Sequence, residues 1–295
     1  MRIAEPRVAV VVVTRNRLSE LLRTLSRLRA LPEEPKVVVV DNASSDGTPE
    51  TVRRRYPGVE VIPLEKNLGG AARNVGVRAA GAPYVAFADD DSWWAPGSVS
   101  RAADLLDAHP RVALLAARVL VGREGREDPI CAEMANGPLP AEPDLPGPPV
   151  LGFLACAAVV RRSAYLEVGG FDPRLLLGGE EELLAADLAS AGWGLVYAKD
   201  LTVYHHPSAV RDSRARRRLT VRNSLWVAWL RRPIASAVRH TTGLLGVLPH
   251  DPDALAGFFE AVRGLPWALR ERRVVPLHIE TKLRMLDRKR GWRPS

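Results

Sequence analysis

The chain has 295 residues, 46% of them hydrophobic, and a formal net charge of +8. A chain of this size and composition can bury one large core or two modest ones. No apolar run is long enough to span a bilayer, and no cleavage-like segment precedes the first apolar stretch. Cys131 and Cys156 are not spaced as metal ligands, so we expect a reducing, cytoplasmic setting.

The positive charge is concentrated late in the chain, from residue 211 onward, where arginines are interspersed with apolar residues. The amino-terminal part mixes both signs, which argues against nucleic acid as the partner. A late basic face suits anionic lipid, a phosphorylated acceptor or solvent.

The first 88 residues alternate apolar runs with helical patterns. Four runs are predicted to be strands, at residues 8–13, 37–40, 59–64 and 84–88. Three helices are predicted between them, at residues 18–28, 50–56 and 69–80. This order predicts an α/β fold with a doubly wound, mainly parallel sheet. The nearly continuous valine in the strands indicates that helices cover both faces of that sheet.

The turn after the first strand, at residues 14–18, contains no glycine. A dinucleotide-binding turn needs glycine so that a pyrophosphate can approach the backbone closely, and this turn lacks it. The sequence contains no P-loop either. Glycines instead follow the third strand, where Asn67, Gly70 and Arg73 surround a helix amino terminus. Such a turn suits a phosphate, with Arg73 pairing with the anion, and the alternative is an ordinary strand-to-helix turn.

Three carboxylates, Asp89, Asp90 and Asp91, directly follow the fourth strand. Open α/β sheets bind ligands beyond the carboxyl ends of their strands. Carboxylate oxygens suit Mg²⁺ or Mn²⁺, often with a phosphate completing the shell. The alternative is a solvated acidic turn that caps a following helix through Asp91 or Ser92.

A second acidic group, Glu180, Glu181 and Glu182, follows a glycine pair and begins a helical pattern that ends near residue 191. Adjacent carboxylates near a metal site raise at least one pKa toward the range useful for a general base. The alternative is that the helix dipole alone favours acids in this first turn.

Four segments, at residues 10–17, 39–48, 67–76 and 89–91, occur in an order and spacing that resemble the family 2 glycosyltransferases with the GT-A fold. The resemblance covers about residues 7–207. It implies one doubly wound, mixed, mainly parallel sheet flanked by helices. We expect residues 1–100 to form the nucleotide-sugar half, 101–210 the acceptor and base half, and 211–295 a helical basic extension.

The same resemblance implies roles for individual residues. Asp41 is expected to bind the base of the nucleotide, with Thr14 and Arg15 against the nucleotide. Asp89 is expected near the ribose and the metal, and Asp91 as the direct ligand of Mn²⁺ or Mg²⁺. The predicted nucleotide-sugar contacts are Thr14, Arg15, Asp41, Asn67, Gly70, Arg73, Asp89 and Asp90. His205, at the end of an apolar run, matches a further metal ligand in many relatives, and the alternative is a polar strand end.

The family carries a Glu-Asp pair at its base motif, and the aspartate is the base. Counting back from residues 191–192 places Glu180 on that glutamate and Glu181 on that aspartate. This chain departs from the pattern, because Glu181 is one methylene longer and the family's next acid falls on Leu183. We predict Glu181 as the base, and Glu180 and Glu182 remain candidates.

Two later segments have less specific patterns. The proline-rich stretch at residues 137–149 predicts an irregular loop, either a rim of the acceptor site or an inert surface loop. In the extension, Leu225, Trp226, Trp229 and Leu230 recur near helical spacing. This pattern favours core packing, and contact with a membrane surface is the alternative.

These observations predict a metal-dependent, inverting glycosyltransferase. It would use a nucleotide diphosphate sugar, with UDP- or dTDP-sugars favoured, and a small-molecule, glycan or lipid-linked acceptor. The alternatives are a sugar nucleotidyltransferase, which would release pyrophosphate, and a non-catalytic protein that binds nucleotide sugars or a membrane surface.

Overall fold

The computed structural model describes residues 6–208, 213–246 and 248–290. The strands are β1 (Val8–Thr14), β2 (Lys36–Asp41), β3 (Glu60–Pro63), β4 (Tyr84–Asp89), β5 (Ser92–Trp94), β6 (Val112–Val121), β7 (Arg126–Glu127), β8 (Ala158–Arg161) and β9 (Gly194–His205). The helices are α1 (Leu18–Arg29), α2 (Thr48–Arg55), α3 (Ala72–Ala79), α4 (Ser98–Ala108), α5 (Pro129–Ala135), α6 (Arg162–Glu167), α7 (Glu180–Ser190), α8 (Ser213–Arg231), α9 (Ile234–Leu245), α10 (Pro252–Arg270) and α11 (Leu277–Arg290).

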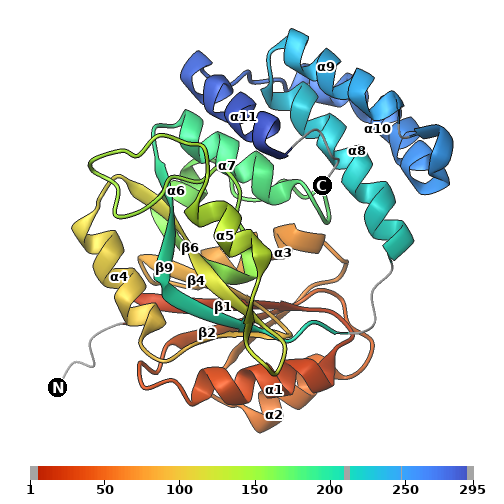
Figure 1. Cartoon of the computed structure of the whole chain (residues 1–295). Coiled ribbons are helices and arrows are strands. Elements are labelled where there is room, and N and C mark those ends of the chain that lie inside the picture. The colour runs from red at the N-terminus through yellow and green to blue at the C-terminus, as the bar shows by residue number, and fades with distance from the viewer. Residues whose placement is uncertain (1–5, 209–212, 247, 291–295) are drawn as a thin grey trace.

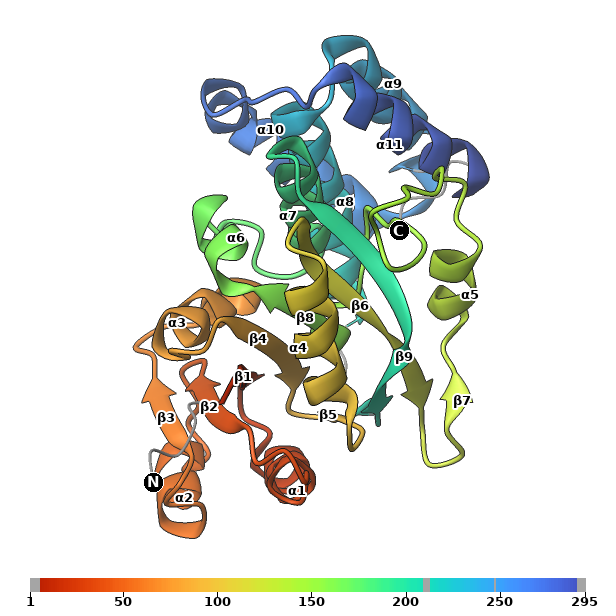
Figure 2. The same cartoon turned by 90° about the vertical axis from the view of Figure 1, so that its left-hand side faces the viewer.

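The described strands form one sheet in the order β3-β2-β1-β4-β8-β6-β9-β5, with β7 beside β6. Strands β1 to β4 pair in parallel, and β6 and β9 run in the same direction. Strand β8 lies antiparallel between β4 and β6, and β5 and β7 also run against their neighbours. The sheet is therefore mixed and mainly parallel, as predicted. Helices flank it in both views (Figures 1 and 2).

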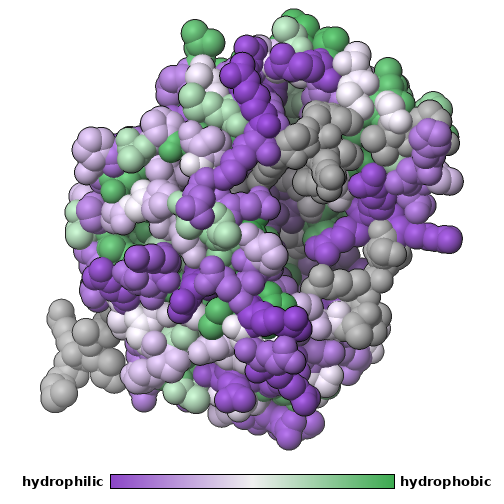
Figure 3. All heavy atoms as spheres, viewed as in Figure 1, coloured by the Kyte–Doolittle hydropathy of each residue, from purple (hydrophilic) through white to green (hydrophobic). Residues whose placement is uncertain are grey.

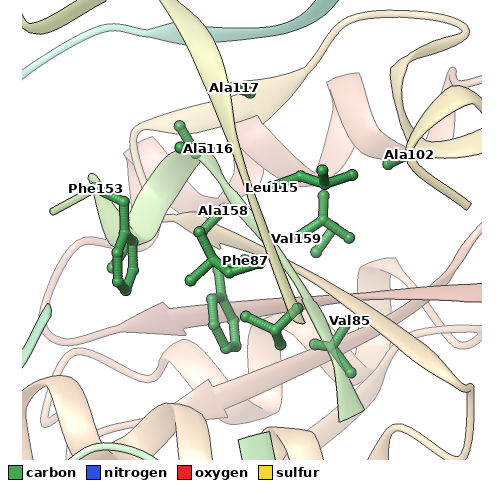
Figure 4. Packing of buried hydrophobic residues seen from close by; sticks show 14 of the residues in the cluster. Val85, Phe87, Ala102, Leu115, Ala116, Ala117, Phe153, Ala158 and Val159 are labelled. Atoms are coloured by element: carbon green, nitrogen blue, oxygen red, sulfur yellow. The ribbon is translucent and has the colours of Figure 1, made fainter. Parts of the chain in front are cut away.

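The four early strands are confirmed to within about two residues at each end. The helix predicted at residues 69–80 begins as a 3-10 turn, Gly69–Ala71, before α3. The core lies where β4, β8 and β6 meet α4, through residues such as Phe87, Val159, Leu115 and Ala102 (Figure 4). This continuous apolar contact keeps the strand ends in fixed positions.

The last four helices form a layer at the top of the molecule in both views (Figures 1 and 2). Helix α8 packs against α7 and α10, and Leu225, Trp226 and Leu230 are buried in an apolar cluster of their own. The predicted core packing is thus confirmed for these residues. Residues 211 and 212, where the extension was expected to begin, lie outside the described residues. None of the described helices is both long and apolar enough to cross a membrane.

Much of the late positive charge is neutralised inside this layer. Among the described residues, ion pairs of these helices include Arg217–Asp251, Arg218–Glu260, Arg222–Glu260, Arg231–Asp187, Arg232–Glu280 and Arg284–Glu280. The indoles expected at a membrane surface also point inward. Trp226 Nε1 donates to the carbonyl of Ala261 at 2.9 Å, and Trp229 Nε1 donates to Thr241 at 3.1 Å. These two tryptophans therefore do not support the membrane alternative.

The proline-rich segment at residues 137–149 has neither helix nor regular strand, as predicted. Glu142 pairs with Arg111 and Lys282, each at 2.6 Å, and Leu145 packs beside Gly194. Gly194 begins β9, whereas His205 ends it. Strand β9 pairs with β6 from Val112 to Val121, so its two ends are roughly 30 Å apart, and this part of the loop lies at the end of the sheet away from the aspartates. Whether this loop is a rim of the acceptor site or an inert surface loop stays a prediction.

Candidate active site

The ends of three neighbouring strands bring the predicted donor residues together. Thr14 is level with Asp41 across β1 and β2, and Asp89 is level with Val13 across β1 and β4. Because parallel strands end at the same edge, side chains far apart in sequence line one crevice there. Arg15 follows β1 and is exposed.

Asp41 is almost completely buried, with 1% of its surface exposed. Its Oδ2 accepts a hydrogen bond from the Ser44 N–H at 3.0 Å. Its Oδ1 has no partner among the described residues. A buried carboxylate oxygen without a partner is costly, so this atom is available to a donor group of a ligand.

Side-chain hydrogen bonds also connect the loops around this crevice. The Asn16 N–H donates to Ser44 Oγ at 2.9 Å, and the Ser45 N–H donates to Asn16 Oδ1 at 2.7 Å. Asn42 Nδ2 donates to the Gly69 carbonyl at 3.1 Å, and Asn42 Oδ1 accepts from the Leu68 N–H at 2.7 Å. Asn42 was not among the predicted site residues, although it lies in a motif segment.

The three aspartates have different surroundings. Asp90 points inward, accepts a hydrogen bond from Thr14 Oγ1 at 3.0 Å, and lies 3.3 Å from an Arg17 nitrogen. Burial raises the pKa of Asp90 to about 7. Asp91 is also buried, and Ser92 begins β5 rather than a helix. The alternative of a solvated, helix-capping turn is therefore wrong.

Asp91 faces His205. Strand β5 pairs with β9 so that Ser92 lies opposite His205, and His205 Nε2 is 3.4 Å from Asp91 Oδ1. Burial alone would raise the pKa of Asp91, but hydrogen bonds from His205 and the Ser208 N–H hold it below its usual value. His206 instead packs on the Trp93 ring, with centroids 4.7 Å apart. Among the described residues, no group of three or more histidine, cysteine, aspartate or glutamate side chains is arranged to hold a metal ion.

Arg73 lies under the crevice as a buried cation. It forms an ion pair with Asp89, and its guanidinium lies 6.0 Å from the Phe87 ring centre and 5.8 Å from that of Phe171. The predicted role of Arg73 was to pair with an anion of the ligand. In the structure its anion is Asp89, so Arg73 orients that carboxylate.

The glycine turn touches the loop before α7. The Gly70 N–H donates to the Leu176 carbonyl at 2.6 Å. Gly69 has a φ of +58°, and a Cβ there would clash with the Leu176 backbone, so glycine is needed at this position. Asn67 is exposed, and its Oδ1 accepts from the Gly69 N–H at 2.9 Å. The phosphate-type turn and the acidic helix are therefore neighbours.

Helix α7 begins at Glu180, so the three predicted acids occupy its first turn. Glu180 is buried against Gly70, and its Oε2 has no partner among the residues described. Glu181 is half-buried, and its Oε1 accepts a hydrogen bond from the Ala155 N–H at 2.9 Å. Burial, together with the neighbouring charge of Glu180, raises the pKa of Glu181 to about 8. Glu182 is also half-buried.

Asn223 of α8 is a residue that the sequence patterns did not identify. It is fully buried, and its Nδ2 lies 2.7 Å from the Leu175 carbonyl oxygen, 3.0 Å from that of Leu177 and 2.5 Å from that of Gly178. Arg222 Nε donates to Asn223 Oδ1 at 2.9 Å, which fixes the orientation of the amide. Asn223 lies between Arg222 and Ser224, just before the apolar run at residues 225–230, so no local pattern marked it.

The comparisons with known proteins agree with this geometry. A family model described as Glycosyl transferase family 2 matches residues 9–169, more than half of the chain. The chain is 33% identical over 231 residues to the N-acetylglucosaminyl-diphospho-decaprenol L-rhamnosyltransferase of Mycobacterium tuberculosis, covering 67% of this chain and 75% of that protein. It is also 33% identical over 222 residues to the pre-mycofactocin glycosyltransferase of the same organism, covering 71% of this chain and 45% of that protein.

Solved structures share the fold. Residues 1–349 of TarS from S. aureus in complex with UDP-GlcNAc match with a TM-score of 0.59 and 20% identity, over 90% of this chain and 84% of that one. The mannosyltransferase PcManGT from Pyrobaculum calidifontis, in complex with GDP-Man and Mn²⁺, matches with a TM-score of 0.57 and 22% identity, over 99% and 78%. A longer TarS chain matches with a TM-score of 0.54 and 24% identity. The match covers 73% of this chain but only 39% of the TarS chain.

The chain belongs to glycosyltransferase family 2 and has the GT-A fold. It is a glycosyltransferase, and this decides between the classes of function that the sequence left open.

Proposed function

We propose that this glycosyltransferase is metal-dependent and inverting, and that Glu181 is its general base. The observation that carries the proposal is the position of Glu181. Its carboxylate is held by the Ala155 N–H, has a pKa raised to about 8, and belongs to the helix whose entry loop touches the glycine turn. A base with a pKa near the working pH is the most effective one.

The donor is proposed to be a UDP- or dTDP-sugar. Uracil and thymine each carry one ring N–H, which matches the unpartnered Oδ1 of Asp41. Thr14, Arg15, Asn67, Gly70 and Asp89 line the same edge of the sheet. Asp90 would support donor binding indirectly, because it accepts a hydrogen bond from Thr14 and so fixes the orientation of that side chain.

The residues present fit a divalent cation in their chemistry. Asp91 and His205 face each other, and carboxylate and imidazole are suitable ligands for Mn²⁺. Asp89, Asp91 and His205 would hold the ion, Mn²⁺ or Mg²⁺, with the donor diphosphate. When bound, the cation would neutralise charge on the leaving diphosphate. The solved complexes of PcManGT and of GalNAc-T7 contain Mn²⁺.

In the proposed reaction, Glu181 takes the proton of an acceptor hydroxyl. The acceptor oxygen forms its bond to the anomeric carbon from the face opposite the nucleotide, and the bond from that carbon to the diphosphate oxygen breaks. The proton ends on Glu181, and the nucleoside diphosphate leaves. The configuration of the anomeric carbon is thereby inverted.

Asn223 is a positioning residue in this proposal. It holds the carbonyl groups of Leu175, Leu177 and Gly178, and so it sets where α7 begins and where Glu181 points. Residues 1–100 would then bind the donor, 101–210 would supply the base, and the extension at 211–295 would hold the base in place.

The acceptor is proposed to be lipid-linked. Support comes from the rhamnosyltransferase relative, whose name specifies an acceptor on a decaprenol diphosphate. The test is calorimetric titration of UDP-, dTDP- and GDP-sugars with and without Mn²⁺, followed by transfer assays with Glu181→Gln. Unchanged donor affinity with lost transfer supports the proposal. Full transfer by that variant contradicts it.

A further inference from the structure

Helix α10 has four of its large apolar residues on the outside. The residues that it buries are small: Ala254, Gly257, Ala261 and Ala268. Gly257 lies so close to α8 that a Cβ would clash with the carbonyl of Arg218. Small residues let the two helices approach closely, and two large residues of α10, Phe258 and Trp267, also pack on the apolar cluster of α8.

The four exposed large side chains form a stripe on the outer face of α10. Leu255, Phe259, Val262 and Leu269 are 39%, 55%, 50% and 47% exposed. Their spacing of four, three and seven residues places them along one side of the helix. We call these four residues the α10 stripe. Hydrophobic surface is visible over the α9 and α10 region in Figure 3, and α9 exposes Ile234, Val238 and Leu245 in a similar spacing.

Arginines border the α10 stripe on one side. Arg263 follows Val262 and Arg270 follows Leu269, so both lie at the margin of the stripe. Both are exposed, and neither forms an ion pair within the described part of the chain. The two acids of α10, Asp253 and Glu260, fall on the other side of the helix, where Glu260 pairs with Arg218. The outer face is thus apolar with a positive margin.

We propose that the α10 stripe docks on the surface of an anionic phospholipid bilayer. An apolar face bordered by arginines suits the boundary between head groups and acyl chains. A second copy of this chain fits less well, because an antiparallel two-fold contact would bring the arginine margin of one copy beside that of the other. The choice of a membrane also rests on the proposed lipid-linked acceptor.

Docking there would place the active site near such an acceptor. Helix α10 packs directly on α8, and Asn223 of α8 holds the loop that leads to Glu181. The stripe and the proposed base are therefore connected through a single helix. An acceptor anchored in the same bilayer would be confined near that helix rather than free in solution.

The test is flotation of the full chain with vesicles that contain neither donor nor acceptor. One set is phosphatidylglycerol with phosphatidylcholine, and the other is phosphatidylcholine alone. The stripe variant carries Phe259→Ser and Val262→Ser, and the charge variant carries Arg263→Gln and Arg270→Gln. The matched control is Leu277→Ser, because Leu277 on α11 is 80% exposed but lies outside the stripe. All these residues are exposed, so the variants should fold.

The wild type is expected to bind the anionic vesicles, and the stripe variant to bind at least about tenfold more weakly. The charge variant should lose the preference for anionic vesicles, and the control should bind as the wild type does. Absent wild-type binding, or equal binding by the stripe variant, overturns the proposal. A wild-type dimer in sedimentation that the stripe variant dissociates also overturns it, in favour of a second copy. Donor titration is separate, so failure of the proposed function would appear there and not in flotation.

Discussion

The edge of the sheet and the carboxyl-terminal helices contribute to the site in opposite ways. At the sheet edge, Asp41 and Asp89 end strands β2 and β4, and Asp91 follows β4, so all three place their own side chains at this edge. In the helical layer, the side-chain amide of Asn223 donates to backbone carbonyls of another segment. In the proposed mechanism, the first region provides groups for the donor, and the second fixes the position of the base. The difference shows that residues which touch a ligand and residues which hold the site are recognised by different signals.

The largest effect is expected for Glu181→Gln. This substitution preserves shape but removes the base, so turnover should fall by about 10²–10⁴-fold with unchanged donor affinity. Glu182→Gln is the matched control on the same helix turn and should retain most of its turnover. The reverse result, an inactive Glu182→Gln with an active Glu181→Gln, would move the base by one residue.

Asp91→Asn should reduce metal-dependent donor binding by about 10–100-fold. A neutral amide is a weaker ligand for a divalent cation than a carboxylate. Asp90→Asn should lose less, because Asp90 points toward Thr14 and its pKa of about 7 already favours partial protonation. Calorimetry with and without Mn²⁺ measures both. Equal losses of donor binding in the two variants would contradict the assignment of Asp91, rather than Asp90, as the metal ligand.

The pH profile should follow the base. Glu181 has its pKa raised to about 8, and a base must be deprotonated to act. Transfer should therefore be low near pH 6 and rise about tenfold per pH unit until it levels near pH 8. Steady-state transfer rates at saturating donor concentration, measured between pH 6 and 8, test this rise. A rate that does not change between pH 6 and 8 would mean that another group takes the proton.

The smallest effect is expected for charge reversal in the helical layer. Arg216 is exposed, and Arg216→Glu should leave donor hydrolysis within about twofold of the wild type. Arg218→Glu places a carboxylate against Glu260 and should lower the free energy of unfolding by about 1 kcal/mol. Hydrolysis assays measure the effect of Arg216→Glu, and thermal denaturation measures the loss of stability in Arg218→Glu. A loss of hydrolysis in Arg216→Glu would give this surface a role in donor chemistry.

Much of this site could be predicted because its residues lie next to strong local patterns. Valine runs located the strands, and residues at the ends of parallel strands meet at one edge, as Thr14, Asp41 and Asp89 do. The inward orientation of Asp90 and the engagement of Arg73 by Asp89 depend on packing between segments, which a local pattern does not encode. Asn223 was missed for the same reason, because its partners lie more than forty residues earlier in the chain.

The most direct test is a double-mutant cycle between Glu181→Gln and Asn223→Ala, with Asn136→Ala as an exposed control. If Asn223 acts by positioning Glu181, Asn223→Ala should lower turnover by about tenfold in the wild type and leave it unchanged in Glu181→Gln. Donor affinity should stay the same throughout, and Asn136→Ala should have no effect. An equal loss from Asn223→Ala in both backgrounds would contradict the account, because the helical layer would then act on something other than the base.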